Sequence, residues 1–212
     1  MAYERHNENL ILASARLINA KRRLVRREQR LGKIEAKSAK NRALGTAKTY
    51  SVILADPPWK FEAGDSDRST ENHYPTMTRA ELLALRVQDI AAKDAVLFMW
   101  ATSPFLSAAL DLMELWGFTY KSHIIWVKPK IGLGFWVRSK HELLLIGTCG
   151  SIPAPLMGTQ PQSVIEAPAG VHSAKPEVFM EMVENLYPTL GKIELFSRAP
   201  RLGWDAWGNE VE

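Results

Sequence analysis

The residues of this chain whose types best suit chemistry are the consecutive Asp56, Pro57, Pro58 and Trp59, which follow a continuous apolar run. The aspartate offers a hydrogen-bond acceptor, and the tryptophan offers a flat face for stacking. The two prolines fix a turn and leave their carbonyls free of local helix bonding. A planar base with an amino group needs these features, because its N–H groups can bond the Asp56 carboxylate and the Pro57 carbonyl while its ring stacks on Trp59.

The tetrapeptide taken alone also has a purely structural interpretation. Asp56 can be only a turn former and Trp59 only a core aromatic, and adjacent prolines are common in chains of this length. The position favours the chemical interpretation. In open α/β sheets, ligands gather outside the carboxyl ends of the strands, and the tetrapeptide directly follows a predicted buried strand.

Two further segments carry candidate substrate contacts. His73 and Tyr74 lie in a polar loop that can act as a lid over a bound base, with ordinary loop packing as the alternative. Segment 128–140 contains both basic and aromatic side chains, and this combination is typical of surfaces that bind nucleic acid. The alternative is that the segment is only the solvated tip of a hairpin. The candidate contacts in this segment are Lys128, Trp136, Arg138 and Lys140.

The histidines and the single cysteine do not form a metal-binding pattern. The sequence has no HxxxH pair and no cysteine–histidine spacing of the kind that binds zinc. Cys149 alone cannot form an internal disulfide, which suits a reducing compartment. With no signal-like N-terminus and no apolar run long enough to span a membrane, we expect a cytoplasmic protein without membrane association.

The elements that must position these residues alternate along the chain from residue 50 onward. The predicted strands are 50–55, 95–101, 120–127, 141–148 and 192–196, and the predicted helices are 78–90, 105–116 and 176–186. Segment 150–172, rich in proline and glycine, is predicted to be mostly loop. This alternation predicts an α/β fold with a mostly parallel sheet, and the adjacent strands around 128–140 predict an antiparallel hairpin at one edge.

Residues 1–48 differ in charge from the rest of the chain. They hold 13 Lys and Arg against 4 Asp and Glu, a net charge of +9, whereas the remaining residues carry −5. A basic arm on an acidic body is typical of attraction to a polyanion, most often nucleic acid. A helix whose charge only keeps the protein in solution is the alternative.

The same arm has the periodicity of a helix over residues 8–42. Leu10, Leu17, Leu24 and Leu31 recur every seven positions among arginines and lysines, which gives a narrow apolar stripe. Such a helix could dock on the body, pair with a second copy as a homodimer, or lie along a phosphate backbone. We therefore expect a basic helical extension at 1–48 and a separate domain at 49–212.

Several blocks of the sequence together resemble the adenine-N6 methyltransferases of the MT-A70 type, in the order expected for that family. The resemblance extends from Tyr50 to the C-terminus and is nearest to the bacterial and phage DNA enzymes. The blocks are ADPPW (55–59), NHYPTM (72–77), LFMWAT (97–102), WGFTYKSHIIWVK (116–128), KHELLLIGT (140–148), HSAKPE (172–177), KIELFSR (192–198) and GWDAWGNE (203–210).

The resemblance implies a permuted Rossmann-like class I methyltransferase that uses S-adenosyl-L-methionine to methylate the exocyclic N6 amino group of adenine in DNA at specific sites. Methylation of RNA adenosine and a non-catalytic nucleic-acid-binding subunit on the same fold remain alternatives. Retention of the acidic and aromatic residues of the tetrapeptide favours an active enzyme. The basic arm argues against a small-molecule or protein substrate. The implied catalytic residues are Asp56, Pro57, Pro58 and Trp59.

The resemblance also implies a cofactor site made from both ends of the domain. Lys175 suits the methionine carboxylate, because it lies just before Pro176 and a helix whose N-terminus favours anions. Glu210 departs from the glutamine that is common in the family, so its expected ribose contact is the least secure. The implied cofactor residues are Asp56, Lys175, Arg198, Asn209 and Glu210.

Overall fold

The computed structural model describes residues 18, 21–22, 25, 29, 44, 47–59, 77–132, 134, 136–170 and 174–208. The chain divides into two units, Met1–Asn41 with Lys60–Thr76, and Arg42–Trp59 with Met77–Glu212. The described residues of the first unit, from Ile18 to Gln29, are all helical. They agree with the predicted helix at those positions, and the rest of that prediction lies outside the described residues.

The second unit contains the predicted alternation of strands and helices, together with two three-residue strands, β5 and β7, that the sequence did not predict. Within the described ranges, no helix is long and apolar enough to cross a membrane. The elements are β1 (Tyr50–Ala55), α2 (Arg79–Ala84), η2 (Val87–Asp89), β2 (Ala91–Ala101), η3 (Ser103–Phe105), α3 (Leu106–Leu115), β3 (Thr119–Val127), β4 (His141–Cys149), β5 (Val164–Glu166), α4 (Glu177–Leu186), β6 (Lys192–Leu195) and β7 (Asp205–Trp207).

The helix predicted over 78–90 is wrong in length, because α2 ends at Ala84 and a separate 3₁₀ turn follows. Its start is set by a capping box, in which Thr78 Oγ1 accepts the N–H of Glu81 at 3.3 Å and the Glu81 side chain accepts the N–H of Thr78 at 2.7 Å. The break lets Val87 and Ile90 reach the core, where both are buried.

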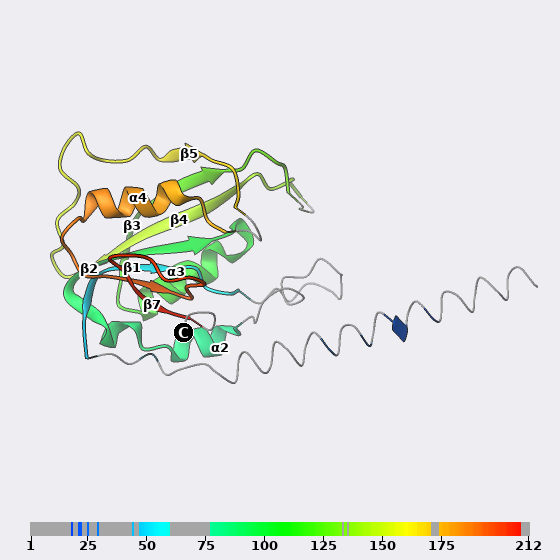
Figure 1. The fold of residues 1–212 in the computed structure, drawn as a ribbon, viewed down its shortest axis with the longest axis horizontal. Helices are drawn as coiled ribbons and strands as arrows, with labels where there is room; N and C mark the ends of the chain where they lie inside the picture. Colours follow the sequence, from blue (N-terminus) through cyan, green and yellow to red (C-terminus); the bar gives the residue numbers. More distant parts are fainter. Residues whose placement is uncertain are drawn as a thin grey trace, which may run out of the picture. The chain divides into compact units, whose positions relative to one another are not determined.

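The described strands form one sheet in the order β5-β3-β4-β2-β1-β6-β7 (Figure 1). Only β4 runs antiparallel to its neighbours, so the mostly parallel sheet is confirmed. The antiparallel hairpin β3–β4 is also present, with β5 added outside β3. Because β1, β2, β3 and β6 point the same way, their carboxyl ends meet at one edge of the sheet.

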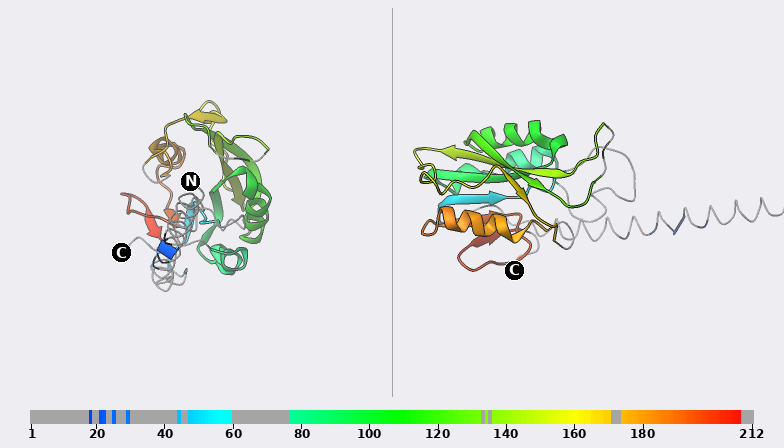
Figure 2. Two further views of the ribbon diagram at one scale, coloured as in Figure 1. Left: turned by 90° about the vertical axis from the view of Figure 1, so that its right-hand side faces the viewer. Right: turned by 90° about the horizontal axis from the view of Figure 1, so that it is seen from above.

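Helices cover both faces of this sheet, with α2 and α3 on one side and α4 on the other (Figure 2). Alternation along β1 sends Ile53 and Ala55 into the core under α2 and α3, and Val52 and Leu54 into the core under α4. Strands buried on both faces must be continuously apolar, and this explains the apolar runs in the sequence.

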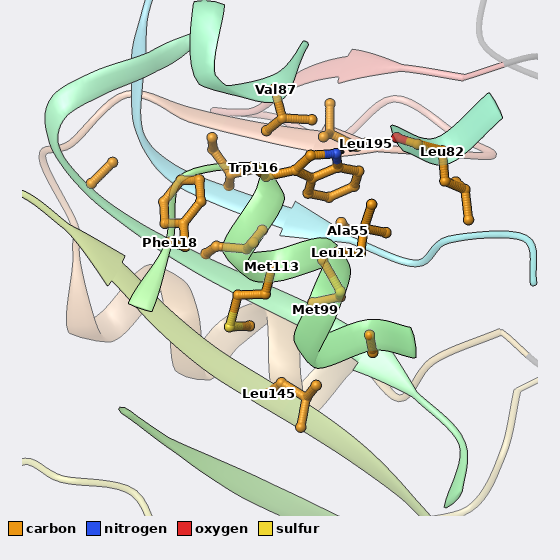
Figure 3. Packing of buried hydrophobic residues seen from close by; sticks show 14 of the residues in the cluster. Ala55, Leu82, Val87, Met99, Leu112, Met113, Trp116, Phe118, Leu145 and Leu195 are labelled. Carbon is orange, nitrogen blue, oxygen red and sulfur yellow. Dashed lines mark hydrogen bonds between the residues drawn. The ribbon is translucent and has the colours of Figure 1, made fainter. Parts of the chain in front are cut away.

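The core under α2 and α3 is built around Trp116, which follows α3 (Figure 3). Its indole is buried against residues of both helices and the sheet, and its Nε1 donates to the Leu82 carbonyl at 3.2 Å. Satisfying the only polar atom of the ring avoids the penalty of a buried unpaired donor. The bond also ties the end of α3 to α2.

Candidate active site

The tetrapeptide from Asp56 to Trp59 leaves β1 at the carboxyl edge of the sheet, as expected. The Asp56 N–H donates to the Leu195 carbonyl at 3.5 Å, which continues the pairing of β1 with β6. Both proline carbonyls accept backbone bonds, Pro57 from the Trp59 N–H at 2.8 Å and Pro58 from the Met77 N–H at 2.9 Å. A carbonyl oxygen has two lone pairs, so Pro57 can still accept a second donor.

Trp59 is held more firmly than the sequence suggests. Its ring stacks on Phe105, with centroids 5.4 Å apart and an interplanar angle of 14°. Its Nε1 donates to the Trp100 carbonyl at 3.3 Å. One face of the indole is therefore occupied within the protein, and a planar ligand that stacks on Trp59 must use the other face.

Lys175 reaches across the edge of the sheet to the tetrapeptide. Its Nζ donates to Asp56 Oδ2 at 2.6 Å, although 119 positions separate the two residues. The same ammonium lies 5.4 Å from the centroid of the buried Trp100 ring. Pro176 is the N-cap of α4, not its first helical residue as predicted, and Lys175 immediately precedes it.

A carboxylate that the sequence did not single out, Glu142 near the start of β4, joins this pair. Glu142 Oε2 lies 3.5 Å from Lys175 Nζ, and its other oxygen pairs with Lys128. Only 9% of Glu142 is exposed. Asp56, Lys175, Glu142 and Lys128 thus form a line of alternating charges, the four-charge chain. The available signal was an acidic residue at the start of an otherwise apolar strand.

The charges around Lys175 determine its protonation. Burial lowers its pKa, but the Asp56 and Glu142 carboxylates outweigh burial and hold the pKa above the ordinary lysine value. Lys175 is therefore an ammonium at neutral pH. A buried charge is tolerated when it is paired in this way. The site consequently has a fixed cation next to the Asp56 carboxylate.

The end of β6 forms a second wall beside Asp56. Burial raises the pKa of the Glu194 carboxyl, and the nearby Asp56 charge raises it further. The Ser197 hydroxyl donates to Glu194 Oε2 at 2.7 Å, and this hydrogen bond lowers the same pKa. Arg198 is exposed and close enough to Lys175 to lower its pKa. Glu194 is a second residue of this edge that the sequence reasoning missed.

The turn after β6 has an unusual backbone. Phe196 has φ of 64°, the left-handed region that non-glycine residues rarely adopt. A Cβ at Gly208 would lie 2.3 Å from the Ser197 carbonyl oxygen, so Gly208 packs directly on this turn. Such strain is concentrated at functional sites. The contact brings the chain just before Asn209 to the end of β6, whereas Asn209 and Glu210 lie outside the described residues.

The candidate substrate contacts divide into three groups. Lys128 faces inward, with its ammonium on Glu142 and 4.7 Å from the Trp126 ring centroid. Trp136, Arg138 and Lys140 are exposed on the loop between β3 and β4, at the carboxyl end of β3. His73 and Tyr74 lie outside the described residues. Of the candidates on these two segments that the structure describes, the exposed residues of that loop can meet a substrate without rearrangement.

Comparisons of the amino-acid sequence show which known proteins this chain resembles. The profile of the MT-A70 family matches residues 50–210. Type II methyltransferase M.MunI of Mycoplasma sp is 36% identical over 183 residues, which covers 77% of this chain and 78% of the relative. The N(6)-adenosine-methyltransferase MT-A70-like protein of Arabidopsis thaliana and the catalytic subunit METTL3 of Homo sapiens are each 31% identical over 173 residues and 77% of this chain. The matches cover only 24% and 28% of those two proteins.

Proposed function

The chain belongs to the MT-A70 family of methyltransferases, and on that basis we propose that it transfers a methyl group from S-adenosylmethionine to the N6 amino group of adenine at specific sites in DNA. The observation that carries the proposal is the Asp56–Lys175 pair, which sets a fixed charged group at the carboxyl edge of the sheet. The match to M.MunI over most of both chains favours the DNA branch, and methylation of RNA adenosine is the second candidate.

The residues at this edge fit S-adenosylmethionine. Lys175 lies next to the N-terminus of α4, and an ammonium beside a helix N-terminus suits a carboxylate. Arg198 and Glu194 at the β6 turn offer a donor and an acceptor for ribose hydroxyls, and Asn209 and Glu210 are the proposed contacts from the following segment. When bound, S-adenosylmethionine supplies the electrophilic methyl group.

The tetrapeptide would hold and activate the adenine amino group. Asp56 Oδ2 accepts from Lys175, so Oδ1 can accept one amino N–H and the Pro57 carbonyl can accept the other. The lone pair of an aryl amine is shared with its ring, and these two bonds direct it out of the ring toward the methyl group. Trp59 would stack on the base with the face that Phe105 does not cover. Positioning supplies most of the acceleration.

The proposal extends to the two parts of the chain and to the compartment of the protein. We propose that residues 1–48 are a basic extension that binds the DNA backbone, and that residues 49–212 carry the methyltransferase. The opposite net charges of the two parts support that division. We also propose the cytoplasm as the compartment, in agreement with the single cysteine.

A transfer assay tests the proposal. The protein is incubated with labelled S-adenosylmethionine and with one DNA fragment, native or heat-denatured, or with RNA of the same sequence, and the labelled nucleoside is identified. We expect N6-methyladenine from DNA. Asp56→Asn, which keeps the shape and removes the charge, should lower the rate at least 100-fold on the usual scale of such losses. Label on cytosine, or none on any adenine, would refute the assignment, and label mainly on RNA would favour the second candidate.

A further inference from the structure

Hydrogen bonds join the two arms of the β3–β4 loop, residues 128–140, of which the structure describes all but 133 and 135. The Lys128 N–H donates to the Lys140 carbonyl at 2.8 Å, directly beyond the paired strands. Farther out, the Gly132 N–H donates to the Ser139 carbonyl at 2.6 Å, and Arg138 Nε donates to the Gly132 carbonyl at 2.7 Å. The two arms of the loop are therefore tied together well past the end of the sheet.

The outer part of the loop requires glycine at two positions. A Cβ at Gly132 would lie 2.9 Å from the Ser139 carbonyl oxygen, and a Cβ at Gly134 would lie 1.9 Å from the Val137 carbonyl oxygen. The second distance is far inside van der Waals contact, so only glycine allows the backbone at position 134 to approach Val137 this closely. Trp136 lies between these two positions in the chain, in the outer part of the loop.

Three apolar side chains near this end of the loop are exposed to solvent. Trp136 is 99% exposed, and Val137 and Ile131 are 76% and 56% exposed. A fully exposed tryptophan is uncommon, since the large ring is usually well buried. An exposed apolar cluster on a hydrogen-bonded loop is typical of an interaction site rather than of a packing element.

The charge of the loop selects the kind of partner. The segment 128–140 contains four Lys and Arg and no Asp or Glu. Lys128 is paired with Glu142, whereas Lys130, Arg138 and Lys140 are exposed beside the apolar tip. A polyanion with an apolar, stacked interior complements such a surface, and DNA has both properties.

We propose that Trp136 is a wedge that enters the base stack of duplex DNA beside the target adenine while the exposed cations hold the flanking phosphates. The inference rests on the proposed function and names duplex DNA as the substrate. In a duplex the amino group is paired and stacked, so the adenine must leave the stack to reach Asp56. An apolar side chain inserted between base steps unstacks them, and stacking of the indole replaces part of the lost contact. The loop follows β3, whose carboxyl end lies at the same sheet edge as Asp56.

The test compares native with heat-denatured samples of one DNA fragment, so the recognised sequence need not be known. Trp136→Ala should lower the kcat/KM for native DNA about tenfold to 100-fold, the size of a lost stacking contact. The change on denatured DNA should stay below about threefold. Trp136→Phe should restore much of the loss. The matched control is Met157→Ala, which truncates a side chain that is 96% exposed on a different loop.

A second variant tests the loop geometry. Gly134→Ala keeps the tryptophan but forces Val137 to move, so it should also impair transfer to native DNA more than to denatured DNA. Once the methylated position is mapped, a duplex with an unpaired target adenine should restore the activity of Trp136→Ala.

The outcomes separate the wedge from the activity itself. Equal loss on native and denatured DNA, no loss on native DNA, or a wild-type enzyme confined to denatured DNA would each overturn the wedge and leave the methyltransferase proposal standing. A wild-type protein that methylates no adenine in either sample would overturn the proposed function instead. Trp136→Ala should melt at the wild-type temperature, because the side chain is in solvent.

Discussion

At the scale of single residues, the four-charge chain depends on Glu142, the only one of its four members for which the sequence predicts no role. Asp56 could be singled out from its sequence neighbours, and Lys175 from its match to a family block. Glu142 could not, because its role arises from two lysines that lie 14 positions before and 33 positions after it. A carboxylate placed between two cations is a property of the folded sheet edge and leaves no local pattern in the sequence.

We expect Glu142→Gln to impair transfer without abolishing DNA binding. The variant leaves Lys175 and Lys128 facing each other with their shared anion removed, so Lys175 should lose its fixed position beside Asp56. A loss of about 10-fold to 100-fold in kcat is the scale expected for a supporting contact of this kind. Single-turnover rates and DNA affinity, measured separately, check the prediction. Glu166→Gln, an exposed acid on β5, is the matched control, and unchanged turnover in Glu142→Gln would contradict the positioning role.

Phe105→Leu should lower the rate of methyl transfer, because Phe105 orients the Trp59 ring. The substitution keeps an apolar side chain but removes the parallel stack that orients the indole. An aromatic pair contributes about 0.5–1.5 kcal/mol, which corresponds to a loss of roughly twofold to tenfold. We expect the loss to appear in kcat and in the KM for DNA, with the KM for S-adenosylmethionine unchanged. Phe105→Tyr should behave as wild type, and an effect confined to the cofactor KM would refute the link to Trp59.

Among the elements, α4 is fastened to the turn between β6 and β7 by Glu184. Its carboxylate accepts from Arg201 Nε at 2.5 Å and from Arg201 Nη2 at 2.9 Å, and also from Trp204 Nε1 at 2.7 Å. This contact fixes the helix whose N-terminus follows Lys175. This contact was not predictable, because no sequence pattern indicates β7 or the turn that presents Arg201 and Trp204 to α4.

The Glu184 contact should make the stability of the protein depend on acid pH, and its loss should remove that dependence. The hydrogen bonds from Arg201 lower the pKa of Glu184 below its ordinary value of 4.5, against the effect of burial. A lowered pKa in the folded state adds stability above pH 4.5 that is lost as the pH falls through the folded pKa. Glu184→Gln should therefore lower the free energy of unfolding by roughly 1–3 kcal/mol at pH 7, with a smaller difference below pH 4. Thermal melts of both proteins across this range check it, and a pH-independent difference would contradict the assigned cause.

The strands that the sequence predicts correctly include the long ones that are buried on both faces of the sheet. Long strands buried on both faces, such as β1 and β2, appear as continuous apolar runs and were predicted. The strands β5 and β7 span three residues each and are recognisable only from their pairing with β3 and β6. The helix at 78–90 was overextended because Val87 and Ile90 keep an apolar spacing while the backbone turns to bury them.

At the scale of the whole chain, the first 48 residues carry a net charge of +9 and the remaining residues carry −5. Deleting residues 1–45 should therefore weaken DNA binding and flatten its dependence on salt, because fewer counterions would be released from the phosphates. Binding isotherms at several salt concentrations measure the slope directly. Unchanged affinity and slope would instead favour a docking or dimerisation helix, which sedimentation of the same variant would distinguish.

The position of β1 between β2 and β6 has a consequence for how the protein is made. β1 pairs with β2 on one side and with β6 on the other, and Asp56 takes its backbone partner from Leu195 and its ionic partner from Lys175. The ribosome therefore completes the tetrapeptide about 140 residues before β6 emerges to fix it. A nascent chain or a prematurely terminated product has Asp56 without its partners, so incomplete copies of the protein should not modify DNA.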